Sequence, residues 1–311
     1  MSEEIEIEVK DDNAGDRVDI FVSRALPGLS RRETQKLIED GGVLINGRRC
    51  RKGTAVEPGD RVWVARVSGA AERRAMPDPS MELCVAYEDA AVVVIDKPAG
   101  RASHPLMADE VGTTANALLA RYPEMSDVGY GPLQPGLVNR LDIETSGLLL
   151  AARTPQAFEV LRQALKSGAV EKHYTCGCAG RVSAPRILDW YLANDPGDRR
   201  KVVACLSETE AVHAGARSAE TVIVQSRVAS GGSLVVVRAL SAFRHQVRVH
   251  LATAGHPLWG DGLYGGPERE GLSRHFLHAS RLSFEHPENG ERIDIESDLP
   301  AELRGCLEFA D

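Results

Sequence analysis

The sequence lacks the features that would place it in a membrane, outside the cell or around a metal ion. No apolar run is long enough to cross a bilayer, and the acidic start MSEEIEIEVKDD has neither the basic nor the apolar region of a secretory signal. We therefore expect a cytoplasmic protein with no membrane partner. The cysteines are few and scattered, and the closest pair, Cys176 and Cys178, is too tightly spaced for a zinc knuckle, so we expect reduced thiols and no metal.

The sequence does contain enough apolar residues for a folded core. Hydrophobic residues occupy 43% of the 311 positions and charged residues only 26%, which excludes a disordered chain and allows two domains. The net charge of −8 hides an uneven distribution: residues 1–16 carry one basic and seven acidic residues, whereas residues 17–74 carry 13 basic and seven acidic ones. We predict a disordered acidic tail over 1–16, followed by a segment that attracts a polyanion.

The basic segment predicts a small α/β domain over 17–67. Apolar residues at helical spacing in DRVDIFVSRAL predict one helix, and Ser30 with Glu33 three residues later forms a capping box for a second. VLINGRR and EPGDRVWVARV predict strands, the first of which turns at Asn46-Gly47. Seven basic residues on the second helix and the hairpin form either a docking face for a polyanion, which we favour, or an ordinary solvated face. These are Arg31, Arg32, Lys36, Arg48, Arg49, Arg51 and Lys52.

This segment resembles the S4-type RNA-binding domain. That family begins its second helix with SR and continues with the pattern G.V.VNG.....G..V..GD.V. Here Ser30-Arg31 is followed by GGVLINGRRCRKGTAVEPGDRVWV. The resemblance implies that the basic face binds structured RNA.

A linker and a larger domain follow. SGAAERRAMPDPS, residues 68–80, combines small and charged residues with two prolines and predicts a linker, which leaves 81–311 as the second domain. Strands are predicted at LCVAY, AVVVID, GLLLAAR, AETVIVQS, SLVVVRAL and RLSFEH, and helices at TPQAFEVLRQALKSG and FRHQVRVHLATAG. Many strands and few helices without regular alternation favour an α+β fold with a mixed, mainly antiparallel sheet.

One acid in the second domain stands in an unusual place. In GLVNRLDIETSGLLLAAR, Asp142 comes two residues after Arg140, and a tight polar turn then leads into a strand that must be buried. Taken alone, such an acid is most often a turn or capping residue. An acid at the end of a core strand is also positioned by the rigid sheet, as catalytic residues usually are.

The string NRLDIETSGLLL resembles the R-L-D-x-x-T-S-G-L motif of the RNA pseudouridine synthases, in their RluA-like (ribosomal large-subunit) branch. Four more blocks agree in order and spacing between Tyr87 and Glu291: YEDAAVVVIDKPAGRASHP, EKHYTCGCAG, HQVRVHLATAGHPLWGDGLYGG and FLHASRLSFEHPENGE. The resemblance covers nearly the whole second domain. It implies that the protein isomerises uridine in RNA.

The resemblance also assigns roles. Asp142 is the essential aspartate, Arg248 its basic partner, and Tyr174 the aromatic residue that packs on the base and is a candidate acceptor of the C5 proton. Arg140 is expected near the space that a flipped-out base vacates, the alternative being a surface ion pair with Glu144. Asn139, His245 and Gln246 are the remaining candidates for substrate binding. The isomerisation involves no redox change, so no cofactor is expected.

Two departures from the family pattern bear on substrate choice. Asn139 replaces the usual His before R-L-D, and Ala242-Phe243 replaces a Gly-Arg pair before HQ.R. Large-subunit ribosomal RNA is the expected substrate, because an S4-like domain commonly accompanies ribosomal substrates in this branch, and transfer RNA is the alternative. A non-catalytic RNA-binding or ribosome-assembly factor with the same fold is a further alternative. An unrelated glycosidase is disfavoured because it would need two marked carboxylates. We expect a monomer.

Overall fold

The computed structural model describes residues 4–26, 29, 31–65, 74–239 and 243–307. The chain divides into two compact units. The first comprises Met1–Met76 with the short segments Leu106–Glu110 and Gly131–Leu133, and the second comprises the rest. In this described part of the chain, every helix is too short or too polar to span a bilayer.

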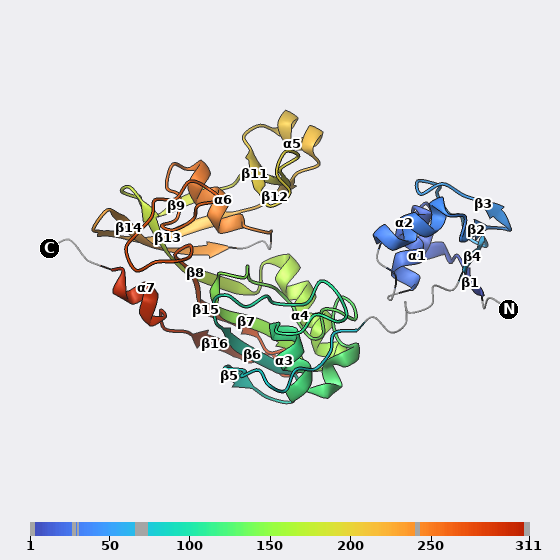
Figure 1. The fold of residues 1–311 in the computed structure, drawn as a ribbon, viewed down its shortest axis with the longest axis horizontal. Helices are drawn as coiled ribbons and strands as arrows, with labels where there is room; N and C mark the ends of the chain where they lie inside the picture. The colour runs from blue at the N-terminus through green and yellow to red at the C-terminus, as the bar shows by residue number, and fades with distance from the viewer. Residues whose placement is uncertain (1–3, 27–28, 30, 66–73, 240–242, 308–311) are drawn as a thin grey trace. The chain divides into compact units, whose positions relative to one another are not determined.

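The first unit is an antiparallel four-stranded sheet with two helices (Figure 1). The strand order is β1-β4-β2-β3, and buried valines from the strands meet Phe21 of the first helix and Ile38 of the second in one core. Asn46 and Gly47 both have positive φ, as expected for the tight turn between β2 and β3. The elements are β1 (Glu4–Glu8), η1 (Asp11–Asn13), α1 (Val18–Ala25), α2 (Arg31–Glu39), β2 (Val43–Ile45), β3 (Arg48–Arg49) and β4 (Arg61–Ala65).

The prediction of a disordered tail over 1–16 is wrong. Glu4–Glu8 forms strand β1, which pairs along its whole length with β4, and Val9 is buried in the core of this unit. The glutamates of β1 alternate with Ile5 and Ile7, so the strand can pair despite its charge. Ser30 of the predicted capping box lies outside the described residues.

The second unit is built on a long mixed sheet of order β5-β6-β7-β15-β8-β14-β13-β9, with β16 paired to β15. Every neighbouring pair is antiparallel except β7 and β15, which confirms the predicted α+β fold class. The strands are β5 (Val85–Glu88), β6 (Val92–Lys97), β7 (Ser146–Ala152), β8 (Glu171–Ala179), β9 (Arg186–Leu188), β13 (Thr221–Ala229), β14 (Gly232–Ala239), β15 (Leu277–Glu285) and β16 (Arg292–Glu296).

Helices cover this sheet, and a smaller sheet is inserted into it. Helix α4 packs on β7, and α6 packs on β13 and β14. Between β9 and β13 the chain forms a three-stranded sheet of order β11-β10-β12 with one short helix (Figure 1). The remaining elements are α3 (Thr114–Arg121), η3 (Pro123–Asp127), α4 (Pro155–Ser167), β10 (Tyr191–Asn194), β11 (Val202–Cys205), α5 (Glu208–Ala214), β12 (Arg217–Ser218), α6 (Gln246–Thr253) and α7 (Ala301–Gly305).

The strand that follows Asp142 lies at the centre of the main sheet. All seven residues of β7 are buried, because β6 and β15 flank it and α4 covers it, which explains its continuously apolar sequence. At its start, Gly147 has φ +107°, and a Cβ there would lie 2.3 Å from the carbonyl oxygen of Ala279 in β15. The glycine of the TSG motif therefore permits the parallel pairing of β7 with β15.

Candidate active site

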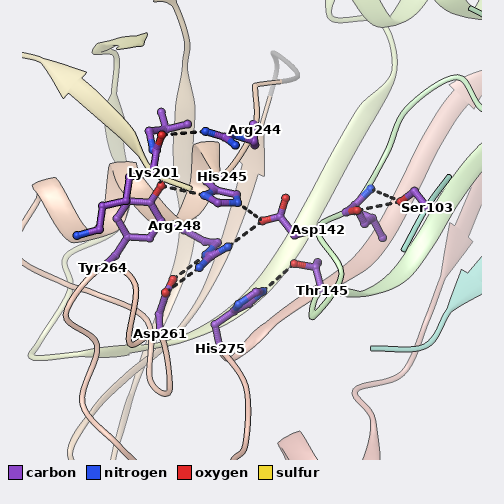
Figure 2. Close-up of polar contacts among 12 residues, drawn as sticks. Ser103, Asp142, Thr145, Lys201, Arg244, His245, Arg248, Asp261, Tyr264 and His275 are labelled. Carbon is purple, nitrogen blue, oxygen red and sulfur yellow. Dashed lines mark hydrogen bonds and ion pairs between the residues drawn. The ribbon is translucent and has the colours of Figure 1, made fainter. Parts of the chain in front are cut away.

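Asp142 lies on a turn that enters β7, and the backbone before it is fixed by a buried serine. The hydroxyl of Ser103 accepts a hydrogen bond from the N–H of Leu141 at 3.1 Å and donates one to the carbonyl of the same residue at 2.8 Å (Figure 2). The turn closes with the N–H of Thr145 donating to the carbonyl of Asp142 at 3.0 Å. The position of the carboxylate is thus set by the sheet and not by a free loop.

Two buried basic side chains fix the carbonyl groups that follow Asp142. The ammonium of Lys97 donates to the carbonyl of Ile143 at 3.0 Å. The guanidinium of Arg274 donates to the carbonyl of Glu144 at 2.8 Å and to the hydroxyl of Ser146 at 3.0 Å. Burial lowers the pKa of Lys97 to about 7, so this side chain is only partly charged at pH 7, whereas the guanidinium of Arg274 is a charged donor. Charged donors form stronger hydrogen bonds than neutral ones, so Arg274 holds the turn firmly.

A histidine completes the support of the turn. The hydroxyl of Thr145 lies 2.8 Å from Nε2 of His275. Burial lowers the pKa of His275 to about 4, so this ring is neutral at pH 7. Within the described residues no group of three or more His, Cys, Asp and Glu side chains is arranged to hold a metal ion, and all six cysteines are free thiols.

A carboxylate–guanidinium–carboxylate chain forms the centre of the site (Figure 2). Arg248 of α6 donates from Nη1 to Oδ2 of Asp142 at 3.2 Å, and from Nε and Nη2 to the two oxygens of Asp261 at 2.7 and 2.8 Å. The exposed fractions of these side chains are 24% for Asp142, 8% for Arg248 and 1% for Asp261. The bidentate pair fixes the guanidinium, while Asp142 remains accessible from the pocket.

The buried end of this chain is ionised. Burial alone would raise the pKa of Asp261, but hydrogen bonds and charge from Arg248 lower that pKa below its usual value. Arg248 therefore sits between two carboxylates with its charge shared. Asp142 keeps oxygen lone pairs for a substrate, because only one of its oxygens accepts from Arg248.

His245 and Tyr264 lie on the same side of Asp142 as Arg248 (Figure 2). His245 has φ +56°, a left-handed conformation that costs a non-glycine residue about 1 kcal/mol or more and places its ring at the start of α6. Its Nδ1 lies 2.9 Å from the hydroxyl of Tyr264, and its Nε2 lies 3.8 Å from Oδ2 of Asp142. Burial lowers the pKa of His245, which favours the neutral ring. The arrangement that satisfies both contacts puts the N–H on Nε2, facing Asp142.

Asp142, His245 and Arg248 line a pocket of about 200 Å³. Lys172 and Tyr174 both line it, because residues two apart on β8 share one face of the strand. Burial, and then the negative charge of Asp142, raise the pKa of Tyr174 above its ordinary value, so the phenol is protonated at neutral pH. Burial also lowers the pKa of Lys172 to about 8.

The structure brings the other predicted second-domain residues to the same pocket, with different surroundings. Arg140 is exposed, and no ion pair joins it to Glu144, although both belong to the described part of the chain. Asn139 uses its amide oxygen to accept from the N–H of Leu150 at 3.0 Å. Gln246 is buried, and its side chain hydrogen bonds the backbone next to α6 and β13. Arg140 is therefore the predicted substrate-binding residue most open to solvent.

The seven basic residues of the first unit are exposed, but three of them have contacts within the unit, among them Lys52, whose Nζ lies 3.9 Å from Oε1 of Glu39. Nε of Arg31 lies 2.9 Å from Oδ2 of Asp19, a carboxylate buried in α1. The guanidinium of Arg49 lies over Gly41 at the end of α2, where a Cβ would approach it to 2.8 Å. The hairpin and the end of α2 therefore do adjoin, as the sequence predicts. The other predicted RNA-binding residues of this unit are also exposed: Arg32, Lys36, Arg48, Arg51 and Lys52.

Sequence reasoning missed several residues of this site, among them Lys97, Asp261, Tyr264 and Arg274. All four lie inside or beside blocks that carry the family resemblance, DKP, GDGLYGG and SRHFLHA, but nothing in their spacing predicts that they contact the turn of Asp142 or its partners. Residue chemistry offered one clue. The block GDGLYGG, which follows Arg248, contains an acid and an aromatic residue, both of which can pair with a guanidinium. We also missed that Phe243 lines the pocket.

Comparisons with known proteins agree with this geometry. The family model described as RNA pseudouridylate synthase matches residues 91–253, and the S4 domain model matches residues 16–62. The first match includes Asp142, Tyr174 and Arg248, and the second includes the basic helix and hairpin of the first unit.

Relatives match almost the whole chain. An RNA pseudouridine synthase of Chloroflexus aurantiacus, described as uncharacterized, is 37% identical over 98% of this chain and 93% of its own. Ribosomal large subunit pseudouridine synthase D of Neisseria meningitidis serogroup A is 32% identical over 94% of this chain and 78% of its own. Among solved structures, human RNA pseudouridylate synthase domain containing 1 superposes with a TM-score of 0.55 at 22% identity, covering 74% of this chain and 91% of that one, which shows a shared fold.

Proposed function

The chain belongs to the RNA pseudouridine synthase family, and we propose that it isomerises specific uridines in structured large-subunit ribosomal RNA with Asp142 as its essential carboxylate. The observation that carries this proposal is the accessible Asp142 carboxylate held 3.2 Å from Arg248 in a pocket with Tyr174. The reaction breaks the N1–C1′ bond, turns the uracil over, forms a C5–C1′ bond, removes the proton from C5 and leaves a proton on N1. It needs no oxidant or reductant.

Each central residue has a role that its surroundings support. Asp142 attacks C1′ or removes a proton from the ribose, and Arg248 orients its carboxylate through a hydrogen bond of 3.2 Å. Tyr174 packs against the uracil. Because its phenol is held protonated, we assign Tyr174 this packing role and not that of the acceptor of the C5 proton, for which it was the candidate from sequence.

The size of the pocket supports base flipping. A uridine stacked in folded RNA hides its glycosidic bond, so the nucleotide must leave the stack at a cost of a few kcal/mol. Arg140, exposed at the pocket and not paired with Glu144, is available to occupy or contact the space that the base vacates. This is the role we propose for it.

The choice of ribosomal RNA rests on two comparisons. The first unit matches the S4 domain model, and several relatives are named ribosomal large subunit pseudouridine synthase D. Transfer RNA is the alternative substrate. A cytoplasmic, monomeric enzyme is part of the same proposal.

Mapping pseudouridine in cellular RNA tests the proposal. Deleting the gene should remove pseudouridine from one or a few positions of large-subunit ribosomal RNA, and adding back the gene should restore them. The measurement is carbodiimide modification followed by sequencing of ribosomal and transfer RNA. Loss of pseudouridine from transfer RNA alone would make transfer RNA the substrate. An unchanged pseudouridine map in both RNAs would overturn the proposal.

The basic face of the first unit should supply affinity and not chemistry. Neutralising Arg32 and Lys36 together should reduce the slope of log affinity against log salt by about two counterions, because each cation that meets a phosphate releases about one. The rate at saturating RNA should stay the same. The measurement is RNA binding from low to moderate salt. Arg31 is a poor probe, because Arg31→Gln would also remove a contact to buried Asp19. An unchanged slope in the double variant would contradict RNA docking on this face.

A further inference from the structure

The pocket has three aromatic residues among its described lining, and they differ in what they offer a ligand. Tyr130 packs edge-on against Phe158 and donates its hydroxyl proton to the carbonyl of Val138 at 3.2 Å. Tyr174 lines the pocket together with Asp142, whose charge contributes to the raised pKa of the phenol. Phe243 has no polar group and presents only its ring.

The backbone of Phe243 is fixed at the start of α6. Its N–H donates to the side-chain oxygen of Gln246 at 3.2 Å, and its carbonyl accepts from the N–H of Gln246 at 3.2 Å. The side chain of Gln246 in turn donates to the carbonyl of Glu220 at 2.8 Å. The backbone that carries the Phe243 ring is therefore held in place at the pocket.

The inserted small sheet supports this ring from behind. The guanidinium carbon of Arg217, an exposed residue of β12, lies 4.8 Å from the centroid of the Phe243 ring. Part of the ring also packs against the cluster formed by Leu192, Val202, Ala219 and Val249. The neighbouring Arg244 donates to the carbonyl of Lys201 at 2.8 Å, in the turn before β11 (Figure 2). Phe243 and Arg244 thus attach the rim of the pocket to the small sheet.

The position and chemistry of Phe243 suit a second base. One base is accounted for, because a uridine with its sugar at Asp142 has its uracil beside Tyr174. Phe243 lines the same pocket with its ring next to the exposed Arg217, and we expect the next nucleotide of the strand to leave the pocket on this side. Nucleobases stack on aromatic rings in a way that depends on ring area, so purines and pyrimidines are held unequally. A guanidinium beside the ring adds attraction for the RNA strand.

We propose that Phe243, supported by Arg217, is a stacking platform for the nucleobase next to the target uridine and helps to select the sequence context that is modified. This inference rests on the proposed function, because it requires an RNA substrate at Asp142. Phe243 is a specificity residue in this proposal and takes no part in bond making.

The test uses the full-length protein and a transcript of large-subunit ribosomal RNA that carries a uridine the wild type modifies. Phe243→Leu keeps the apolar bulk and removes the ring. It should raise KM about tenfold, the fold-change that corresponds to losing one stacked base, and leave the single-turnover rate at saturating RNA within about twofold. Phe243→Trp should restore a low KM.

A second arm changes the RNA and begins with the wild-type protein. Replacing the base on one side of the target by an abasic site should raise the KM of the wild type by a similar factor, and combining that RNA with Phe243→Leu should cause no further rise. Arg217→Gln should raise KM about threefold, whereas Arg186→Gln, an exposed arginine of β9, should not.

The outcomes separate the two proposals. If the wild type forms no pseudouridine in any ribosomal or transfer RNA transcript, the proposed function fails. If the wild type is active but abasic RNA on both sides binds normally, or if the abasic and Phe243→Leu effects multiply, the stacking platform is overturned and the proposed function stands.

Discussion

Asp142→Asn is expected to abolish pseudouridine formation, with a fall in the single-turnover rate of at least about 10³-fold. An amide can neither attack C1′ nor remove a proton from the ribose. The substitution is nearly isosteric, and Arg248 retains its bidentate pair with Asp261, so the fold should be unchanged. The measurement is release of tritium from RNA labelled at C5 of uridine, under saturating enzyme.

RNA affinity separates an enzyme from a binding factor in the same experiment. Affinity should change by less than about twofold in Asp142→Asn, because the phosphate contacts we propose lie on the first unit. Asp189→Asn, which changes an exposed aspartate, is the matched control and should be fully active. A wild type that binds ribosomal RNA but releases no tritium would favour the non-catalytic alternative, and an active Asp142→Asn would remove the carboxylate from the mechanism.

The parts of the fold that the sequence predicts well are those in which a local pattern is sufficient. The helix α4 begins with Thr154 as N-cap, continues with an apolar stripe and ends at Gly168 in the left-handed conformation, all of which are local signals. The continuous apolar run of β7 likewise predicts a strand buried on both faces. The turn at Asn46 follows from residue type alone.

Elements without a local pattern were missed. Strand β8 carries Lys172, His173 and Gly177 among its apolar residues, so its alternation is broken where the strand passes the pocket. Gly177 is required there because a Cβ would lie 2.3 Å from the ring of Trp259, a contact that no local pattern reveals. The acidic β1 was predicted as disordered because its pairing partner, β4, is more than fifty residues away in the sequence.

The same distinction applies to the site. Asp142, Arg248 and Tyr174 were found because the resemblance names them, and the structure then brings all three to one pocket. Their supporting residues could not be predicted, because Lys97 and Arg274 act on backbone carbonyl groups, which carry no sequence signature. A residue that fixes a catalytic turn through its backbone is visible only once the chain is folded.

Arg248→Met is expected to lower the free energy of unfolding of the second unit by about 3–5 kcal/mol and to abolish activity. The guanidinium is 8% exposed, and its removal leaves the carboxylate of Asp261, 1% exposed, charged and without its bidentate partner. Methionine keeps much of the apolar volume of the arginine side chain. The fall in the free energy of unfolding therefore measures mainly the loss of the positive charge. Urea unfolding at pH 7 measures the first effect, and tritium release the second.

The difference in free energy of unfolding between the wild type and Arg248→Met should depend on pH in a definite direction. In the wild type the pKa of Asp261 is lowered, so the pair contributes stability above the usual carboxylate range and loses it as the pH falls through that lowered pKa. In Arg248→Met the buried acid has no cation, and protonation relieves its burial. The difference in free energy of unfolding between the two proteins should therefore be largest near pH 7 and become smaller as the pH falls. A gap independent of pH would show that lost packing, and not the unpaired acid, causes the destabilisation.

A double variant separates the two roles of Arg248. Arg248→Met with Asp261→Asn removes both charges, and replacing both partners of a buried pair is far less costly than removing one, so at least half of the lost stability should return. Activity should not return, because Asp142 still lacks its cation 3.2 Å away. Recovery of both would mean that Arg248 serves catalysis only by keeping the fold intact. Recovery of stability alone would show that the same guanidinium neutralises a buried acid on one side and supports a reacting carboxylate on the other.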